Sequence, residues 1–199
     1  NNYNLLCLNI MSSPGAGKTR LLEITLEDLS KKFHSAVLEG DMTTNLDAAR
    51  LEKLNIPVVP ITTGRACHLD ANMVSGGLKL LEKKINPDLL DILLVENVGN
   101  LVCPAEFEIG EHFKVALLSI TEGEDKPLKY PIMFREADLI LITKVDLLPH
   151  LNFDINELKS NIASTNPKAD VIEISSITKS GFDLWQDWIS KKILKFKNN

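Results

Sequence analysis

The chain has 199 residues, of which 44% are hydrophobic and 25% charged, and its net charge is -5. This composition is typical of a folded globular protein, it excludes a disordered chain or a fibrous repeat, and its acidic balance argues against a general nucleic-acid or anionic-membrane surface. Three cysteines are too few for a disulfide framework, and no apolar run approaches the ~18 residues that span a bilayer, so we expect a cytoplasmic protein in a reducing environment.

Short apolar runs alternate with longer stretches of helical periodicity along the whole chain. The pattern is typical of βαβ units and predicts an α/β fold: a mainly parallel central sheet of about seven strands with helices on both faces. The expected strands are residues 5–11, 36–39, 58–61, 92–95, 115–120, 139–143 and 171–174. The expected helices are residues 19–32, 46–54, 69–84, 130–136, 155–165 and 182–194.

The domain organisation follows from the absence of linkers, repeats and low-complexity segments. We expect a single domain over residues 1–199. The first residue is Asn1 instead of Met, which is consistent with a missing N-terminal extension.

A phosphate-binding loop follows the first expected strand. Residues 12–19 read SSPGAGKT and lead into an expected helix. Small residues let backbone N–H groups close around an anion, Lys18 adds a positive charge for the β- and γ-phosphates, and the Thr19 hydroxyl suits Mg²⁺. The pattern GxxxxGK[ST] is met except at its first position, where Ser12 replaces Gly. The residues expected to contact a nucleotide here are Pro14, Gly15, Ala16, Gly17, Lys18, Thr19 and Arg20.

Two later strand ends favour guanine as the base. Thr143, Lys144 and Asp146 form the sequence TKVD, which is similar to the NKxD element of GTPases with Thr in the Asn position. The Asp146 carboxylate would accept hydrogen bonds from guanine N1–H and the exocyclic amine, while Lys144 lies along the base and Thr143 ties the loop to the phosphate-binding loop. Ser175 and Ser176 resemble a loop whose backbone contacts the guanine oxygen. A solvated turn is the alternative for the TKVD segment, and the two serines alone would indicate little.

Acidic residues at two other strand ends are candidates for a magnesium site. Asp41 follows the second strand, and Glu96 follows the fourth in a Walker-B-like position, three residues before Gly99, which would let a backbone amide approach the γ-phosphate. Phosphoryl transfer needs charge neutralisation and an oriented water. Asp47 fits a switch segment, although a helix cap explains it equally well. The expected magnesium ligands are Thr19, Asp41 and Glu96, and the expected catalytic residues are Lys18, Asp41 and Asp47.

Two cysteines and a histidine are candidates for a soft-metal site. Cys67 and His68 stand at the expected start of the third helix, whose N-terminus would favour a thiolate, and Cys103 follows the fourth strand. Thiolates and an imidazole suit Zn²⁺ or Ni²⁺, although three ligands leave the coordination sphere open to water or a second copy of the chain. Spacing alone favours two structural cysteines and an unrelated histidine. Cys7 lies in an apolar run and is expected in the core.

Together the motifs resemble the HypB family of nickel-inserting GTPases of NiFe-hydrogenase maturation, in the SIMIBI class of P-loop NTPases. The resemblance spans nearly the whole chain and implies binding of GTP or GDP with Mg²⁺. It also implies a Ni²⁺ or Zn²⁺ site at a homodimer interface, built from Cys67, His68 and Cys103, in place of the structural interpretation. The segments that carry it are residues 12–19, 39–41, 63–71 (TGRACHLDA), 96–104 (ENVGNLVCP) and 121–131 (TEGEDKPLKYP).

The resemblance further implies GTP hydrolysis coupled to nickel delivery, with metal affinity and dimer state following the nucleotide. The implied partners are a HypA-type nickel chaperone, the hydrogenase large subunit and a second copy of the chain, which Lys126 would reach in a GTP-favoured homodimer. We expect neither a nucleic-acid nor a membrane partner. The chain departs from the family pattern at Thr143, and no N-terminal metal-binding segment is visible.

Three other functions fit parts of the sequence. A UreG-like urease maturation GTPase has a similar nucleotide site, but its metal motif is typically Cys-Pro-His, where this chain has Cys-His-Leu-Asp. A P-loop kinase or ATP-dependent ligase has no need for Asp146. A nucleotide-binding metal adaptor with little turnover remains open, because no glutamine or arginine finger is evident near the phosphate-binding loop and hydrolysis is therefore expected to be slow.

Overall fold

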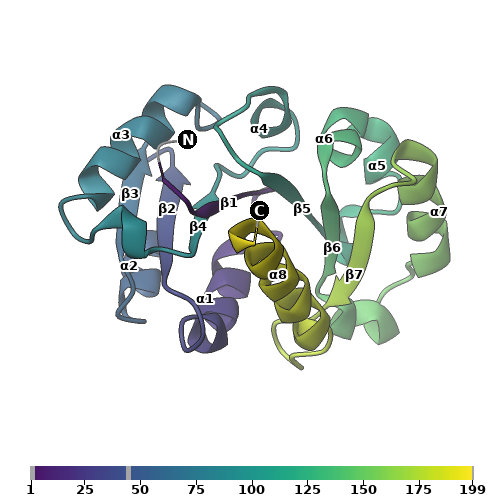
Figure 1. Ribbon diagram of the computed structural model, residues 1–199. Coiled ribbons are helices and arrows are strands. Elements are labelled where there is room, and N and C mark those ends of the chain that lie inside the picture. Colours follow the sequence, from purple (N-terminus) through teal and green to yellow (C-terminus); the bar gives the residue numbers. More distant parts are fainter. Residues whose placement is uncertain (1–2, 44–45, 199) are drawn as a thin grey trace.

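A parallel β-sheet forms the centre of the computed structural model, which describes residues 3–43 and 46–198. Over these residues the sheet has seven strands in the order β3-β2-β4-β1-β5-β6-β7 (Figure 1). The strands are β1 (Leu6–Ser12), β2 (Ser35–Asp41), β3 (Val58–Thr62), β4 (Ile92–Glu96), β5 (Phe113–Ser119), β6 (Leu139–Thr143) and β7 (Asp170–Ile174). The predicted fold class and all of the predicted strands are confirmed.

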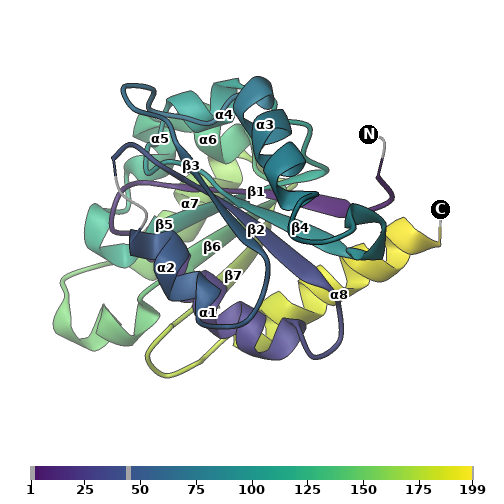
Figure 2. The same cartoon turned by 90° about the vertical axis from the view of Figure 1, so that its left-hand side faces the viewer.

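Helices cover both faces of the sheet, as predicted (Figure 2). On one face lie α1 (Lys18–Leu29), α2 (Leu46–Glu52) and α8 (Phe182–Lys197). On the other lie α3 (Ala71–Leu81), α4 (Cys103–Glu106), α6 (Pro131–Glu136) and α7 (Ile155–Thr165), with α5 (Lys126–Lys129) beside α6 and α7. Short 3-10 helices are η1 (Pro87–Leu89), η2 (Ile120–Glu122) and η3 (Val145–His150).

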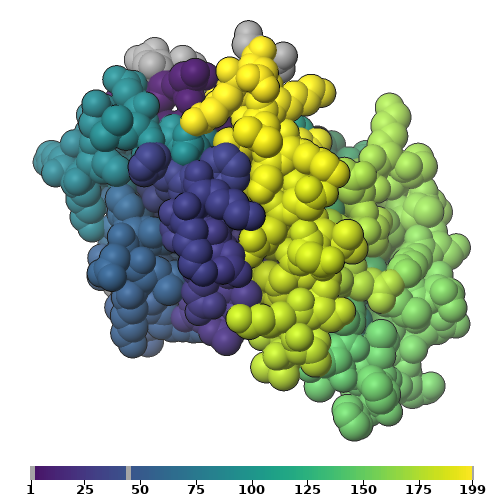
Figure 3. Space-filling model, turned by 60° about the horizontal axis from the view of Figure 1, so that its bottom comes forward, coloured from purple at the N-terminus to yellow at the C-terminus, as the bar shows by residue number. Residues whose placement is uncertain are grey.

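The mostly apolar sequence of β1, LCLNIMS, follows from its burial on both faces. Leu6 and Leu8 pack towards α1 and α8, whereas Cys7 packs towards α3 on the opposite face. Cys7 is buried, as predicted, and burial raises the pKa of its thiol to about 12. The helices α1 and α8 lie side by side (Figure 3), where the Trp185 indole donates a hydrogen bond to the Thr25 hydroxyl at 2.9 Å.

The third helix begins at Ala71, two residues later than predicted, and therefore does not include the residues just after His68. Asp70 ends the preceding loop in an extended conformation and accepts a hydrogen bond from Met73 N at 2.8 Å, which makes it the N-cap. The short helices α4 and α5 were not predicted, because four residues carry no apolar periodicity.

Gly181 is a position where the fold demands glycine. It caps α8 with φ of 76°, and a Cβ there would lie 2.0 Å from the Glu173 carbonyl oxygen. We expect Gly181→Ala to lower the free energy of unfolding by about 2–4 kcal/mol, measured by urea denaturation. Gly76→Ala is the matched control, because Gly76 lies inside α3 with open space around its Cβ position, and it should raise stability by up to about 1 kcal/mol.

Candidate functional site

A pocket of about 470 Å³ lies at the carboxyl ends of the central strands. In the strand order, β2, β3 and β4 lie on one side of β1, whereas β5, β6 and β7 lie on the other, and ligands of open α/β sheets bind at such a switch point. We call this pocket the phosphate pocket. Its lining residues are Pro14, Gly15, Gly17, Lys18, Thr19, Arg20, Glu39, Gly40, Asp41, Met42, Asp47, Arg50, Glu96, Asn97, Val98 and Gly99.

The loop between β1 and α1 has the backbone shape of an anion cradle. Gly15 and Gly17 have φ of 77° and 101°, and a Cβ on either would meet no atom within 4 Å, so the space above the loop is open. Lys18, the first residue of α1, donates a hydrogen bond to the Ser12 hydroxyl at 3.1 Å, and burial lowers the pKa of its ammonium group. Ser12 ends β1 and lies outside the left-handed region, which explains why no glycine is needed there. The loop therefore fits a phosphate chain.

Two buried glutamates face the pocket beside Thr19. Glu39 on β2 and Glu96 on β4 are partners in register, and the Thr19 hydroxyl donates to Glu96 Oε1 at 2.7 Å. Glu39 Oε2 and Glu96 Oε2 are buried without a hydrogen-bond partner. Burial raises the pKa of Glu39 to about 8, helped by the Glu96 charge, and that of Glu96 to about 7, opposed by Lys18. Unpartnered carboxylate oxygens next to a hydroxyl fit Mg²⁺, a cation that prefers oxygen ligands.

Sequence reasoning did not select Glu39, although it selected Asp41 two residues later. Both line the pocket, and Asp41 Oδ1 accepts a hydrogen bond from Met42 N at 2.5 Å. The position of Glu39 beside Glu96 depends on β2 pairing with β4, which is not its neighbour along the chain. No local motif reveals that pairing.

The raised pKa of Glu39 predicts a pH-dependent stability in the nucleotide-free protein. The unfolded chain releases the Glu39 proton near the ordinary glutamate pKa of 4.5, whereas the folded chain keeps it up to a pKa of about 8. The free energy of unfolding should therefore fall as the pH rises from about 4.5 to about 8. Glu39→Gln removes this effect, and we expect it to be more stable than the wild type at pH 8 by on the order of 1–3 kcal/mol and similar at pH 4.5. Urea denaturation in EDTA checks this, with exposed Glu136→Gln as the control.

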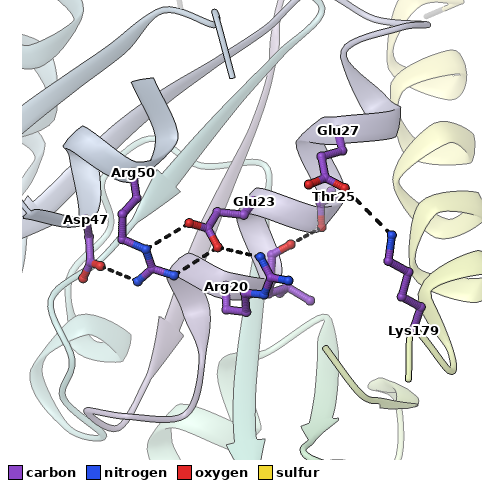
Figure 4. Close-up of polar contacts among 8 residues, drawn as sticks. Arg20, Glu23, Thr25, Glu27, Asp47, Arg50 and Lys179 are labelled. Atoms are coloured by element: carbon purple, nitrogen blue, oxygen red, sulfur yellow. Dashed lines mark hydrogen bonds and ion pairs between the residues drawn. The ribbon is translucent and has the colours of Figure 1, made fainter. Parts of the chain in front are cut away.

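Asp47 is held at the pocket by an ion-pair network (Figure 4). Arg50 Nη1 donates to Asp47 Oδ1 at 2.9 Å, and its other two nitrogens donate to both carboxylate oxygens of Glu23 at 2.9 and 3.0 Å. Arg20 donates to the same carboxylate at 3.0 Å. Bidentate arginine–carboxylate pairs fix orientation, so α1 positions the first turn of α2. Sequence reasoning missed Arg50 and Glu23, and part of the preceding switch segment, residues 44–45, lies outside the described residues.

The residues predicted to read the base lie at the ends of β6 and β7. The Thr143 hydroxyl donates to the Ala16 carbonyl at 2.9 Å, which is the predicted link to the phosphate-binding loop. The Ser175 hydroxyl donates to Asp146 Oδ1 at 2.5 Å and accepts from two backbone N–H groups, at Ile177 and Thr178, both at 3.1 Å. Ser175 thus orients the Asp146 carboxylate. Lys144 adopts a left-handed conformation with φ of 61°, and Ser176 follows Ser175 in the same loop.

The chain brings together two cysteines and a histidine from two separate segments, the loop before α3 and the start of α4, and we call them the Cys–His cluster. Its ligand atoms, on Cys67, His68 and Cys103, all lie within 4.8 Å of one another. The two sulfurs are 3.0 Å apart, and the hydrogen bond shared with Cys67 raises the pKa of the Cys103 thiol. The His68 ring stacks on Phe107, with centroids 4.0 Å apart. Two thiols and an imidazole suit Ni²⁺ or Zn²⁺. The spacing alone favoured two structural cysteines and an unrelated histidine, and that interpretation is wrong because the three side chains lie close together.

Within the residues that the structure describes, no helix is both long enough and apolar enough to cross a membrane.

The phosphate-binding loop ahead of α1, the parallel sheet and the buried carboxylates define a nucleotide-binding protein of the P-loop class. Residues 6–173 match the family model described as CobW/HypB/UreG, nucleotide-binding domain. The chain belongs to this family.

Several relatives are similar over most of the chain. Hydrogenase maturation factor HypB of Azotobacter vinelandii is 50% identical over 190 residues, which cover 95% of this chain and 61% of that protein. The same factor of Escherichia coli (strain K12) is 50% identical over 184 residues, covering 92% of this chain and 62% of that protein. This chain therefore spans less than two thirds of the length of these relatives.

Solved structures agree with the fold. The crystal structure of HypB from Helicobacter pylori in complex with nickel is similar with a TM-score of 0.91 and 41% identity, covering 96% of this chain and 88% of that one. The signal recognition particle receptor FtsY from Elizabethkingia anophelis in complex with GDP has a TM-score of 0.58 at 13% identity, covering 85% of this chain and 57% of that one. The second similarity concerns the fold alone.

Proposed function

We propose that this chain is a GTP-hydrolysing nickel metallochaperone that assists nickel insertion into NiFe-hydrogenase. One observation carries the proposal: β4 and the segment after it supply both Glu96, in the phosphate pocket, and Cys103, in the Cys–His cluster. A nucleotide site and a soft-metal site thus share one short segment. The relatives named as hydrogenase maturation factors, one of them crystallised with nickel, support the same function.

GTP would lie with its phosphates on the loop before α1 and its base beside Asp146. The backbone N–H groups of residues 15–19 and the Lys18 ammonium group would bind the phosphates, while Thr143, Lys144 and the serines after β7 would complete the base site. Mg²⁺ would neutralise phosphate charge there, and Thr19, Asp41, Glu96 and Glu39 are the groups that would hold it, directly or through water.

Hydrolysis would be slow in the isolated chain. Among the described residues no glutamine lines the phosphate pocket, and both arginines that line it, Arg20 and Arg50, are already ion-paired. Asp41 and Asp47 are the carboxylates that we propose as catalytic residues, and Lys18 would stabilise charge on the transferred phosphoryl group.

Nickel is the cargo of the proposed function. Cys67, His68 and Cys103 supply three ligands, and a second copy of the chain would complete the coordination sphere in a homodimer favoured by GTP, with Lys126 reaching the partner subunit. We place this single domain in the cytoplasm, where it would meet a HypA-type nickel chaperone and the hydrogenase large subunit. Urease maturation is the second candidate, because a Helicobacter pylori relative, 42% identical, is described as a hydrogenase/urease maturation factor.

The test measures phosphate release and nickel transfer together. We expect hydrolysis of GTP but not of ATP, and GTP-dependent transfer of nickel from the chain to an apo-hydrogenase large subunit. Lys18→Ala should abolish both, whereas exposed Lys31→Ala, in the segment after α1, should change neither. Transfer to the large subunit without nucleotide would overturn the GTPase role, and transfer to apo-urease alone would favour the second candidate.

A further inference from the structure

Leu69 lies between the two sites. It follows His68 directly, it is fully buried, and its side chain occupies the space over Gly40, where a Cβ would come within 2.7 Å of Leu69 Cδ1. Gly40 belongs to β2 and lines the phosphate pocket. A displacement of the β2 end therefore acts directly on the residue next to a metal ligand, because close-packed interiors transmit such shifts.

Asn97 holds the backbone of Leu69 from the other side. Its side chain is fully buried, and its Oδ1 accepts hydrogen bonds from Leu69 N and Val98 N, both at 2.9 Å. Its Nδ2 donates to Asn9 Oδ1 at 3.1 Å. Both polar atoms of the amide are thus used, and losing Oδ1 would leave two buried N–H donors unpaired.

The segment that carries Asn97 is bound to the phosphate-binding loop. Asn100 N donates to the Ser12 carbonyl at 2.7 Å, and a Cβ on Gly99 would lie 3.0 Å from the Pro14 Cα. The same segment continues into Cys103, the first residue of α4. Movement of the phosphate-binding loop therefore reaches Leu69 through one buried side chain, that of Asn97.

We propose that Asn97, acting on Leu69, is the positioning residue that couples the phosphate pocket to the Cys–His cluster. When the end of β4 shifts, the hydrogen bond from Leu69 N to Asn97 Oδ1 moves the backbone beside His68 with it. The distance from His68 to Cys103 therefore differs between the GDP-bound and the GTP-bound protein. The inference rests on the proposed function, since it needs both ligands to bind. Coupling between two sites is reciprocal, so nickel also alters nucleotide affinity by the same factor.

The experiment compares Ni²⁺ affinity in the GDP-bound and GTP-analogue-bound protein. In the wild type we expect the two affinities to differ by about fivefold or more, a typical allosteric coupling. In Asn97→Ala the ratio should fall below about twofold. Asn9→Ala is the matched control, because it breaks the same buried network but leaves the bond from Leu69 N to Asn97 Oδ1, and its ratio should stay near that of the wild type. Asn97→Asp keeps an acceptor and should restore most of the ratio.

Three results would overturn the inference: a wild-type ratio in Asn97→Ala, an equal loss in Asn9→Ala, or a wild-type ratio of one. A wild-type ratio of one would contradict only the coupling, because nickel and nucleotide would each still bind. A wild type that binds neither ligand would contradict the proposed function itself. If Asn97→Ala does not fold, hydrogen exchange of the Leu69 amide in the wild type decides. Its protection should differ between the two nucleotide states, and equal protection contradicts the link.

Discussion

The Cys67→Ala, Cys103→Ala double variant is expected to bind Ni²⁺ at least about 100-fold more weakly than the wild type, since single changes around metal sites already cost about 10–100-fold. The two sulfurs lie 3.0 Å apart with the His68 ring beside them, so both thiolates can reach one ion. Without them a single imidazole remains, and soft-metal affinity depends on the thiolates. Competition titration against a chromophoric chelator gives the affinity.

The third cysteine supplies the matched control. Cys7 is buried in β1 and belongs to none of the described groups of potential metal ligands, so Cys7→Ala should keep the wild-type nickel affinity. Equal affinity of the double variant and the wild type would remove the metal assignment. A loss in Cys7→Ala as large as in the double variant would show that thiol content, not the cluster, determines binding.

Local patterns explain why most of the fold was predictable. The apolar strands and the SSPGAGKT loop are continuous in sequence, so the residues that define each of them can be recognised without knowing which distant segments they contact. The link from Thr143 to Ala16 was predicted for the same reason, because each residue sits in a recognisable strand-end motif. The predicted start of the third helix was two residues earlier than the observed start at Ala71, because the prediction did not identify Asp70 as the N-cap.

The remaining features depend on contacts between distant segments. Glu39 meets Glu96 only because β2 pairs with β4, and Arg50 meets Glu23 across two helices, 27 residues away. Likewise, the cysteines of the cluster are 36 residues apart in sequence, and spacing alone favoured unrelated roles for them. Tertiary packing, which no local pattern contains, brings each of these pairs together.

Asp146→Asn is expected to weaken GTP binding by about 100-fold or more. The carboxylate would accept two charge-assisted hydrogen bonds from guanine, each worth about 1.5–3 kcal/mol, and an amide cannot accept both. Ser175 presents that carboxylate by donating to its Oδ1 at 2.5 Å, and it can still donate to the amide oxygen, so the loop should keep its shape. Competition with a fluorescent guanine nucleotide measures the affinity.

The base chemistry also predicts a gain for the Asp146→Asn variant. Xanthine carries a carbonyl where guanine carries its exocyclic amine, so the amide N–H₂ that this substitution introduces would donate to that carbonyl, and affinity for xanthosine triphosphate should rise as that for GTP falls. Exposed Asp187→Asn on α8, away from the site, should alter neither affinity. Unchanged preference for GTP over both xanthosine triphosphate and ATP would show that the base is read elsewhere. The reversed preference would locate guanine recognition at the end of β6, with Thr143 linking it to the loop that holds the phosphates.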